Sequence, residues 1–169
     1  MKIAIISDTH DNIPNVEKFL FWAEKNGIKE IIHCGDIASP ETVELLIKLP
    51  LHLVFGNMDK SYREIISQMV RPNLTIYGDE GKMKITVGKK LTRTAKIVFC
   101  HLPERARELA QSGKYNLVFY GHTHKPWMED LDDCQLINPG TLGGVFNKAT
   151  FAVYDTEENK LDLKILEQL

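Results

Sequence analysis

The sequence predicts an α/β protein in which two facing β-sheets are flanked by helices, an α/β/β/α sandwich. Over the first two thirds of the chain, short apolar runs alternate with amphipathic stretches, as expected for parallel strands joined by helical crossovers. After His124 the apolar runs follow one another without a helix between them. The polar turn at residues 155–159 joins two of these runs into an antiparallel hairpin. We therefore expect the hairpin-rich second part to build a second sheet that packs on the first.

The elements of the first part have recognisable lengths and end signals. The expected strands are short apolar runs, at residues 2–7, 28–34, 51–55, 74–77, 83–87, 96–100 and 116–120. The expected helices are residues 14–26, 40–49, 62–70 and 103–112. The first helix has Pro14 in its first turn and is followed by Gly27, whereas the second begins at Pro40 and stops before Pro50.

The last third of the chain is expected to contain strands only. These strands are residues 135–137, 149–154 and 161–165, and the last two form the hairpin. No repeat, low-complexity tract or linker interrupts the sequence. We therefore expect a single domain over residues 1–169, in line with the usual size of domains.

The charge balance and the cysteines limit partners and compartment. The 169 residues include 21 Lys and Arg and 23 Asp and Glu, a formal net charge of −2. Duplex nucleic acid is not an expected partner, because neutralising its phosphates needs an excess of basic residues. The apolar runs are too short to cross a membrane, and the first residues do not resemble a signal peptide. Three cysteines without a CxxC pair fit reduced thiols, so we expect a cytoplasmic protein.

Polar side chains of three types follow five of the expected strands, each within a few residues of the strand end. They are Asp8, His10, Asp36, Asn57, Asp59, His101, His122 and His124. The carboxyl ends of strands in an open α/β sheet share one edge, and ligands bind at that edge. We therefore expect these side chains to converge although they are far apart in the sequence.

The donor types of this cluster indicate a metal site. Carboxylate oxygen, imidazole nitrogen and amide oxygen suit manganese, iron, zinc or nickel. Leaving Asp59 aside, the remaining seven groups exceed the needs of one ion and fit two ions that share a carboxylate. Two ions roughly 3.5–4 Å apart assist in-line displacement at phosphorus. Gly35, Gly56 and Gly121 each precede one of the polar residues, and we expect them to permit backbone angles that other residues resist.

The polar clusters form ordered motifs: Asp8-Thr9-His10, Gly35-Asp36, Gly56-Asn57-Met58-Asp59, His101 and Gly121-His122-Thr123-His124. In this order they resemble the motifs of the calcineurin-like metallophosphoesterases. The downstream stretch Asn138-Pro139-Gly140-Thr141 resembles a signature of the small bacterial and archaeal phosphodiesterases of the YfcE type. The resemblance covers nearly the whole chain and implies the metallophosphoesterase sandwich fold.

The resemblance also implies a function and a set of site residues. The expected activity is that of a binuclear metal-dependent phosphodiesterase, in which a metal-bridging hydroxide attacks small phosphodiesters. One ion would be held by Asp8, His10, Asp36 and His124. The other would be held by Asp36, Asn57, His101 and His122, which are also the expected catalytic residues, with Asp36 bridging the two ions. Manganese is the expected metal, with nickel, iron and zinc as alternatives.

Two positions depart from the family pattern. Many relatives have Gly-Asn-His-Glu where this chain has Met58 after Asn57, and a methionine can neither bind phosphate nor protonate a leaving group. This favours diesters or substrates with good leaving groups. Leu102 and Pro103 replace a glycine and a second histidine that many relatives have after the metal ligand His101.

Several polar residues near the motifs admit an ordinary structural role. We expect His33 to be a hydrogen-bonded core or interface histidine, Asn12 to order the turn before the first helix, and Arg105 to form a surface ion pair. Asp59 has two equally supported roles, a contact to a ligand or water and the cap of the following helix.

Two other classes of function share the expected fold. The alternative to an enzyme is a non-catalytic metal-binding interaction scaffold that resembles the small retromer subunit, and the complete set of ligand residues favours the enzyme. A DNA-repair nuclease is disfavoured, because the chain lacks room for a capping domain and an excess of basic residues. The expected partner is a small phosphodiester, not a membrane, and a homo-oligomer is left open. Loops at residues 60–81 and 128–134 are expected to shape the pocket for the substrate.

Overall fold

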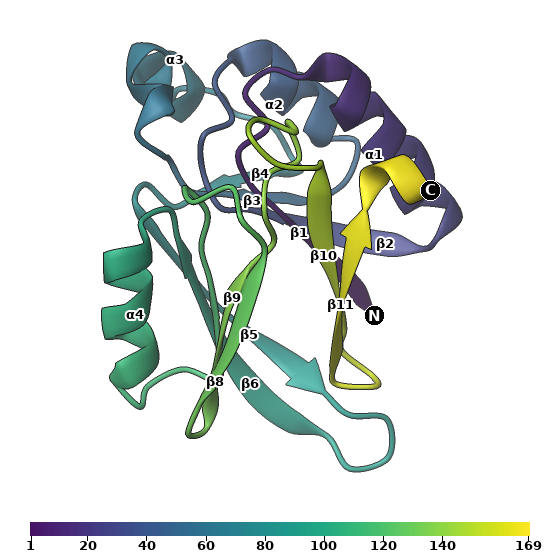
Figure 1. The fold of residues 1–169 in the computed structure, drawn as a ribbon, viewed down its shortest axis with the longest axis vertical. Helices are drawn as coiled ribbons and strands as arrows, with labels where there is room; N and C mark the ends of the chain where they lie inside the picture. The colour runs from purple at the N-terminus through teal and green to yellow at the C-terminus, as the bar shows by residue number, and fades with distance from the viewer.

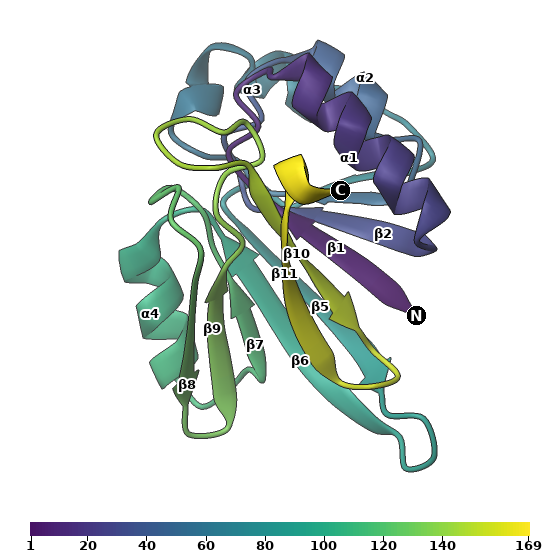
Figure 2. The same ribbon diagram turned by 45° about the vertical axis from the view of Figure 1, so that its right-hand side comes forward.

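A computed structural model describes residues 1–169 as four layers, with two sheets between helices (Figures 1 and 2). The helices are α1 (Ile13–Lys25), α2 (Pro40–Leu46), α3 (Arg63–Ser67) and α4 (Pro103–Gln111), with short 3₁₀ helices η1 (Met58–Ser61) and η2 (Leu166–Gln168). The arrangement confirms the expected α/β sandwich. None of the helices has the length and apolar character needed to span a membrane.

The first sheet has six strands in the order β11-β10-β1-β2-β3-β4. They are β1 (Lys2–Ile6), β2 (Ile28–His33), β3 (Leu51–Leu53), β4 (Leu74–Ile76), β10 (Thr150–Asp155) and β11 (Lys160–Ile165). Strands β1 to β4 are parallel neighbours, as the alternation of strands and helices predicts.

The C-terminal hairpin forms as expected, but it belongs to the first sheet and not to the second. Strand β10 pairs antiparallel with β1. Both faces of β10 are buried: Phe151 packs toward α1, and Tyr154 packs between the two sheets. A strand that is apolar on both faces has to lie inside the layered core, and the edge of β1 provides that position.

The second sheet has five strands in the order β5-β6-β7-β9-β8. They are β5 (Glu80–Val87), β6 (Arg93–Cys100), β7 (Leu117–Phe119), β8 (Trp127–Leu131) and β9 (Cys134–Asn138). Strand β8 was not predicted, because this edge strand is exposed or half-buried throughout and has no apolar periodicity. Strands β6, β7 and β9 are parallel, so their carboxyl ends point toward one edge.

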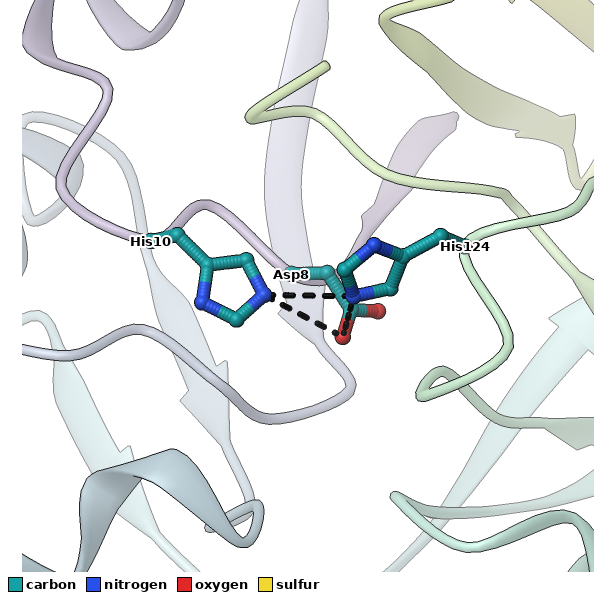
Figure 3. A group of neighbouring side chains, drawn as sticks. All are labelled: Asp8, His10 and His124. Atoms are coloured by element: carbon teal, nitrogen blue, oxygen red, sulfur yellow. Dashed lines mark hydrogen bonds and ion pairs between the residues drawn. The ribbon is translucent and has the colours of Figure 1, made fainter. Parts of the chain in front are cut away.

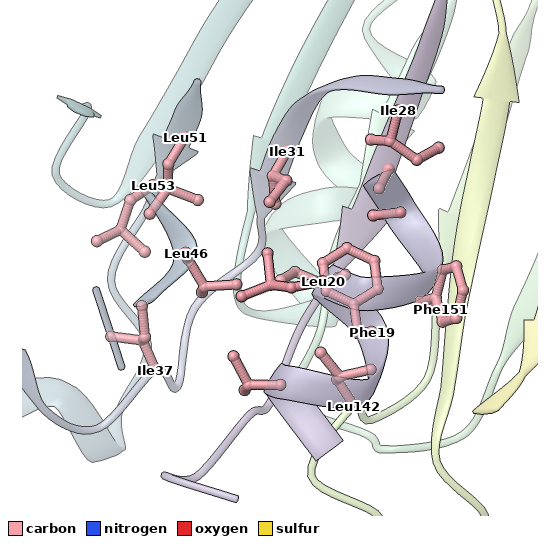
Figure 4. Packing of buried hydrophobic residues seen from close by; sticks show 14 of the residues in the cluster. Phe19, Leu20, Ile28, Ile31, Ile37, Leu46, Leu51, Leu53, Leu142 and Phe151 are labelled. Atoms are coloured by element: carbon pink, nitrogen blue, oxygen red, sulfur yellow. The ribbon is translucent and has the colours of Figure 1, made fainter. Parts of the chain in front are cut away.

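Three apolar clusters hold the layers together and fix the positions of the strand ends. The first lies between α1, α2 and the first sheet, where Phe19 meets Phe151 edge-to-face with ring centroids 5.0 Å apart (Figure 4). The second fills the space between the sheets, and the third lies between α4 and the second sheet. Helix α2 ends at Leu46 and not at residue 49, because Leu49 N–H donates to the Leu46 carbonyl in a tighter 3₁₀ turn.

Candidate metal centre

The loops that follow β1, β2, β3, β6 and β7 bring the expected polar side chains together. Potential ligand atoms gather within 4.8 Å of one another in two groups, Asp8 with His10 and His124, and Asp36 with His101 and His122. Asn57 adjoins the second group, since its Oδ1 lies 3.0 Å from His101 Nε2. The predicted convergence is therefore observed for all seven residues.

In the first group, three ligand atoms point at one spot (Figure 3). His124 Nε2 lies 3.1 Å from Asp8 Oδ1 and 3.2 Å from His10 Nε2. His10 Nε2 is 3.8 Å from the same Asp8 oxygen. His124 Nδ1 donates to the carbonyl of Val145 at 3.0 Å. A histidine that donates through Nδ1 presents the lone pair of Nε2, which is the arrangement of a metal-binding imidazole.

The second group has the same design and is linked to the first through Asp36. His101 Nδ1 donates to the Cys34 carbonyl at 2.9 Å, so the Nε2 lone pair faces the group. Asp36 Oδ2 lies 3.4 Å from His101 Nε2 and 3.9 Å from His10 Nε2. The Asp36 carboxylate therefore lies between the two groups, where a ligand shared by two ions would have to be.

Burial leaves this centre short of positive charge. Burial raises the pKa of Asp8 above its ordinary value, and Asp8 Oδ1 is a buried oxygen without a hydrogen-bond donor. Burial also acts to raise the pKa of Asp36, but a protonated His101 beside it outweighs burial and lowers that pKa, so a cation at this place favours the ionised carboxylate. Asp36 in turn raises the pKa of His101 against the effect of burial. A buried carboxylate oxygen facing imidazole lone pairs fits a divalent cation well.

The backbone at the centre is strained in a way that the sequence does not reveal. Five of the residues in the two groups have positive φ angles: Asp8 (53°), His10 (43°), Asp36 (57°), His122 (69°) and His124 (58°). Side chains other than glycine rarely adopt this region, and such strain concentrates at functional sites.

The glycines before the ligand residues have two different roles. The expectation of unusual backbone angles is correct for Gly35, whose φ is 96°. It is wrong for Gly56 and Gly121, where glycine is required because neighbouring atoms leave no room for a side chain. A Cβ on Gly56 would lie 2.1 Å from Asp36 Oδ1, and one on Gly121 would lie 1.9 Å from Ser7 Oγ.

Asp59 does not cap the following helix, which is one of the two roles that the sequence left open. Its buried carboxylate accepts three backbone N–H groups, from Gly56 (2.6 Å), Asp36 (3.0 Å) and Ala38 (2.9 Å). These bonds join the loop after β3 to the loop after β2. Asp59 therefore holds the backbone that carries Asp36.

Sequence reasoning missed other residues that organise the loops. Asp11 Oδ1 accepts from Ser39 N–H and from two hydroxyl groups, those of Ser39 and Thr42, which ties the β1 loop to the start of α2. Asn138 Nδ2 donates to the Gly121 carbonyl, and Thr141 Oγ1 donates to the Asp8 carbonyl. The stretch at residues 138–141 stands out in the sequence as a signature, but only the contacts show that it braces the loops of Asp8 and His122.

Three structural roles are confirmed. Fully buried His33 accepts from Gly35 N–H through Nδ1, and its Nε2 lies 3.1 Å from Thr9 Oγ1. Asn12 Oδ1 accepts from Asn15 N–H and caps α1. Arg105 forms an ion pair with Glu80 at 2.8 Å.

The two loops expected to shape the pocket have different positions. A cavity of about 350 Å³ adjoins the second group and is lined by Asn57, His101, Lys60, Asp79 and others, so part of the stretch at residues 60–81 borders it. Residues 128–134 belong instead to the β8–β9 hairpin, whose turn lies at the far end of the sheet (Figure 2). That turn borders a larger cavity of about 550 Å³, remote from the metal centre.

Comparisons with known proteins agree with the fold. A phosphodiesterase of Methanocaldococcus jannaschii is 30% identical over 99% of this chain and 100% of its own. Vacuolar protein sorting-associated protein 29 of Schizosaccharomyces pombe is 30% identical over 94% of this chain and 80% of its own. The solved structure of an archaeal phosphodiesterase superposes with a TM-score of 0.73 at 28% identity, covering 98% of this chain and 99% of the other. The phosphoesterase Yfce of E. coli shares the fold, with a TM-score of 0.67 at 18% identity and coverage of 98% and 100%.

Together, the two-sheet fold and the paired clusters of His and Asp define a metal-dependent phosphoric ester hydrolase. The domain model of the calcineurin-like phosphoesterase superfamily matches residues 1–159. The chain belongs to this superfamily, and its members use divalent metals.

Proposed function

We propose that this protein is a binuclear metal-dependent phosphodiesterase that hydrolyses small phosphodiesters. The observation that carries the proposal is the position of Asp36 between two groups of ligand atoms, within 4 Å of a histidine of each. We assign Asp8, His10, Asp36 and His124 to one ion. We assign Asp36, Asn57, His101 and His122 to the other, with manganese as the metal to test first.

Backbone carbonyls orient two of the histidines of this centre. The carbonyls of Val145 and Cys34 fix the tautomers of His124 and His101, so both Nε2 atoms face inward as lone pairs. Two divalent ions bound there would generate a nucleophile from water near neutral pH and neutralise the phosphoryl oxygens. Met58 N–H donates to Asp36 Oδ1 and leaves Oδ2 free to face both groups.

The surroundings favour diesters with acidic leaving groups. Met58 is exposed and carries no proton to donate, and Asp59 is occupied by three backbone N–H groups. Neither residue can therefore serve as a general acid for a basic leaving group. The adjoining cavity of about 350 Å³ has the size of a site for a small ester arm.

The direct test combines metal analysis with hydrolysis of a generic aryl phosphodiester in the presence of manganese. We expect two ions per chain and turnover that a chelator abolishes. One ion per chain would contradict the binuclear assignment, and hydrolysis of monoesters alone would contradict the substrate class.

The second candidate is a non-catalytic scaffold, favoured by the similarity to vacuolar protein sorting-associated protein 29 over most of both chains. Metal content cannot separate the two candidates, since a Vps29 structure from Entamoeba histolytica is a complex with zinc. Hydrolysis decides between them. Protein that binds metal but turns over no ester with several divalent metals would favour the scaffold.

A further inference from the structure

An exposed aromatic ring lies beside the first group of ligand residues. Phe146 is 92% exposed, yet its ring stacks on the imidazole of His124, with centroids 5.8 Å apart and planes inclined by 29°. One face of the phenyl ring is therefore turned to a proposed metal ligand, and the other is open to solvent. The loop that carries it is closed at its base by an isolated bridge between Thr141 and Ala149.

The backbone at Phe146 adopts an unfavourable conformation to place this ring. Phe146 has a φ of 64°, a region that bulky L-residues rarely adopt because it is sterically unfavourable. Burial of the ring does little to offset this, because so much of its surface remains in water. The preceding carbonyl, that of Val145, accepts the hydrogen bond from His124 Nδ1. The contact that orients the imidazole therefore also positions the phenyl ring.

We propose that Phe146 is a specificity-determining residue that stacks against a planar ring on one ester arm of the substrate. The inference rests on the proposed function, which places phosphorus next to His124. In this proposal, an ester arm that extends past His124 meets the open face of Phe146, which stacks on that histidine. The other arm enters the cavity that His101 and Asn57 line. Aromatic rings attract one another beyond the burial of area, so aryl and nucleotide-like diesters are preferred over alkyl ones.

The test uses two diesters with the same leaving group, p-nitrophenyl benzyl phosphate and p-nitrophenyl cyclohexylmethyl phosphate. We expect the natural protein to prefer the benzyl ester by about two- to tenfold in kcat/KM, mainly through KM. Phe146→Leu removes the ring but keeps a side chain with the same backbone restriction, and it should abolish the preference. Phe146→Tyr should retain it. Phe21→Leu is the matched control, because Phe21 is an exposed ring on α1, away from the metal centre.

Calorimetric titration of the metal-loaded protein with benzylphosphonate and cyclohexylmethylphosphonate gives a second readout that needs no turnover. If the natural protein hydrolyses no diester, the proposed function fails, but a tighter benzylphosphonate complex that is lost in Phe146→Leu would still support stacking. Equal affinities in the natural protein would overturn the inference. A Phe146→Leu variant that keeps the ring preference but loses metal would also overturn it, because the ring would then only shield His124.

Discussion

Replacing Asp59 by Asn tests whether this carboxylate is a structural anchor of the metal centre. Its Oδ2 accepts from Asp36 and Gly56, and its Oδ1 accepts from Ala38. An asparagine can keep one of these oxygens, so its NH₂ group must face at least one backbone N–H. One buried donor then loses its acceptor, and the remaining bonds lose their charge. A bond to a charged group contributes about 1.5–3 kcal/mol, so we expect a loss of roughly 2–4 kcal/mol in the free energy of unfolding.

The measurement is denaturant unfolding of Asp59→Asn and of the natural protein, with and without manganese. The loss should be larger with manganese, because the displaced loop carries Asp36 and the ions bind less tightly. Asp162→Asn is the control, since this carboxylate pairs with Lys160 on the exposed surface and its charge should matter by less than about 1 kcal/mol. A variant with natural stability and metal content, but with slower hydrolysis of esters with basic leaving groups, would refute the anchor and make Asp59 a general acid.

Three further predictions follow from the same geometry. Asp36→Ala should abolish turnover and lower the occupancy of both ions, measured by metal analysis, and two ions remaining per chain would contradict the shared ligand. Burial lowers the pKa of His33 to about 3, so the folded protein keeps it neutral while the unfolded chain binds a proton below about pH 6.5. The stability that this histidine contributes is thus present above pH 6.5 and lost toward pH 3, by about 1.4 kcal/mol per pH unit. In unfolding experiments, the free energy of unfolding of metal-free His33→Gln should decline correspondingly less as the pH falls. Met58→His should narrow the rate gap between diesters with acidic and with basic leaving groups, because a positioned acid contributes about 10²–10⁴-fold. The measurement is the hydrolysis rate of a series of substituted phenyl esters. If the rate in the natural protein does not depend on the pKa of the leaving group, another acid is present.

The sequence revealed the positions of the ligand residues because strand ends can be read from short apolar runs. Asp8, Asp36 and His101 lie within three residues of the ends of such runs, and parallel strands bring their carboxyl ends to one edge. Hydrophobic patterning could not show which sheet receives the C-terminal hairpin, since β10 is apolar on both faces and fits either sheet. It also could not reveal β8, whose stability comes from its ladder with β9 and not from burial.

The residues that position the ligands were harder to find than the ligands themselves. Asp11 and Asp59 act through bonds to backbone N–H groups of distant loops, and no spacing in the sequence encodes such contacts. The positive φ angles at Asp8 and His122 are equally hidden, because they arise from the tertiary bracing of the loops. Only the packed structure connects these features to the metal centre.

The place of β1 in the middle of the first sheet has a consequence for how the protein is made. Its two neighbours are β2, which follows it closely, and β10, which is separated from it by most of the chain. During synthesis, one edge of β1 therefore stays without a partner until residues 150–155 have left the ribosome. The loop that carries Asp8 likewise lacks its hydrogen bond from Thr141 Oγ1 until residue 141 has been synthesised. Closing such long loops is slow, and an open strand edge can pair with another chain in the meantime. The loop that carries Asp8 thus gains this brace only after residue 141 has been made, and nascent chains that stop short of the hairpin expose the open edge of β1.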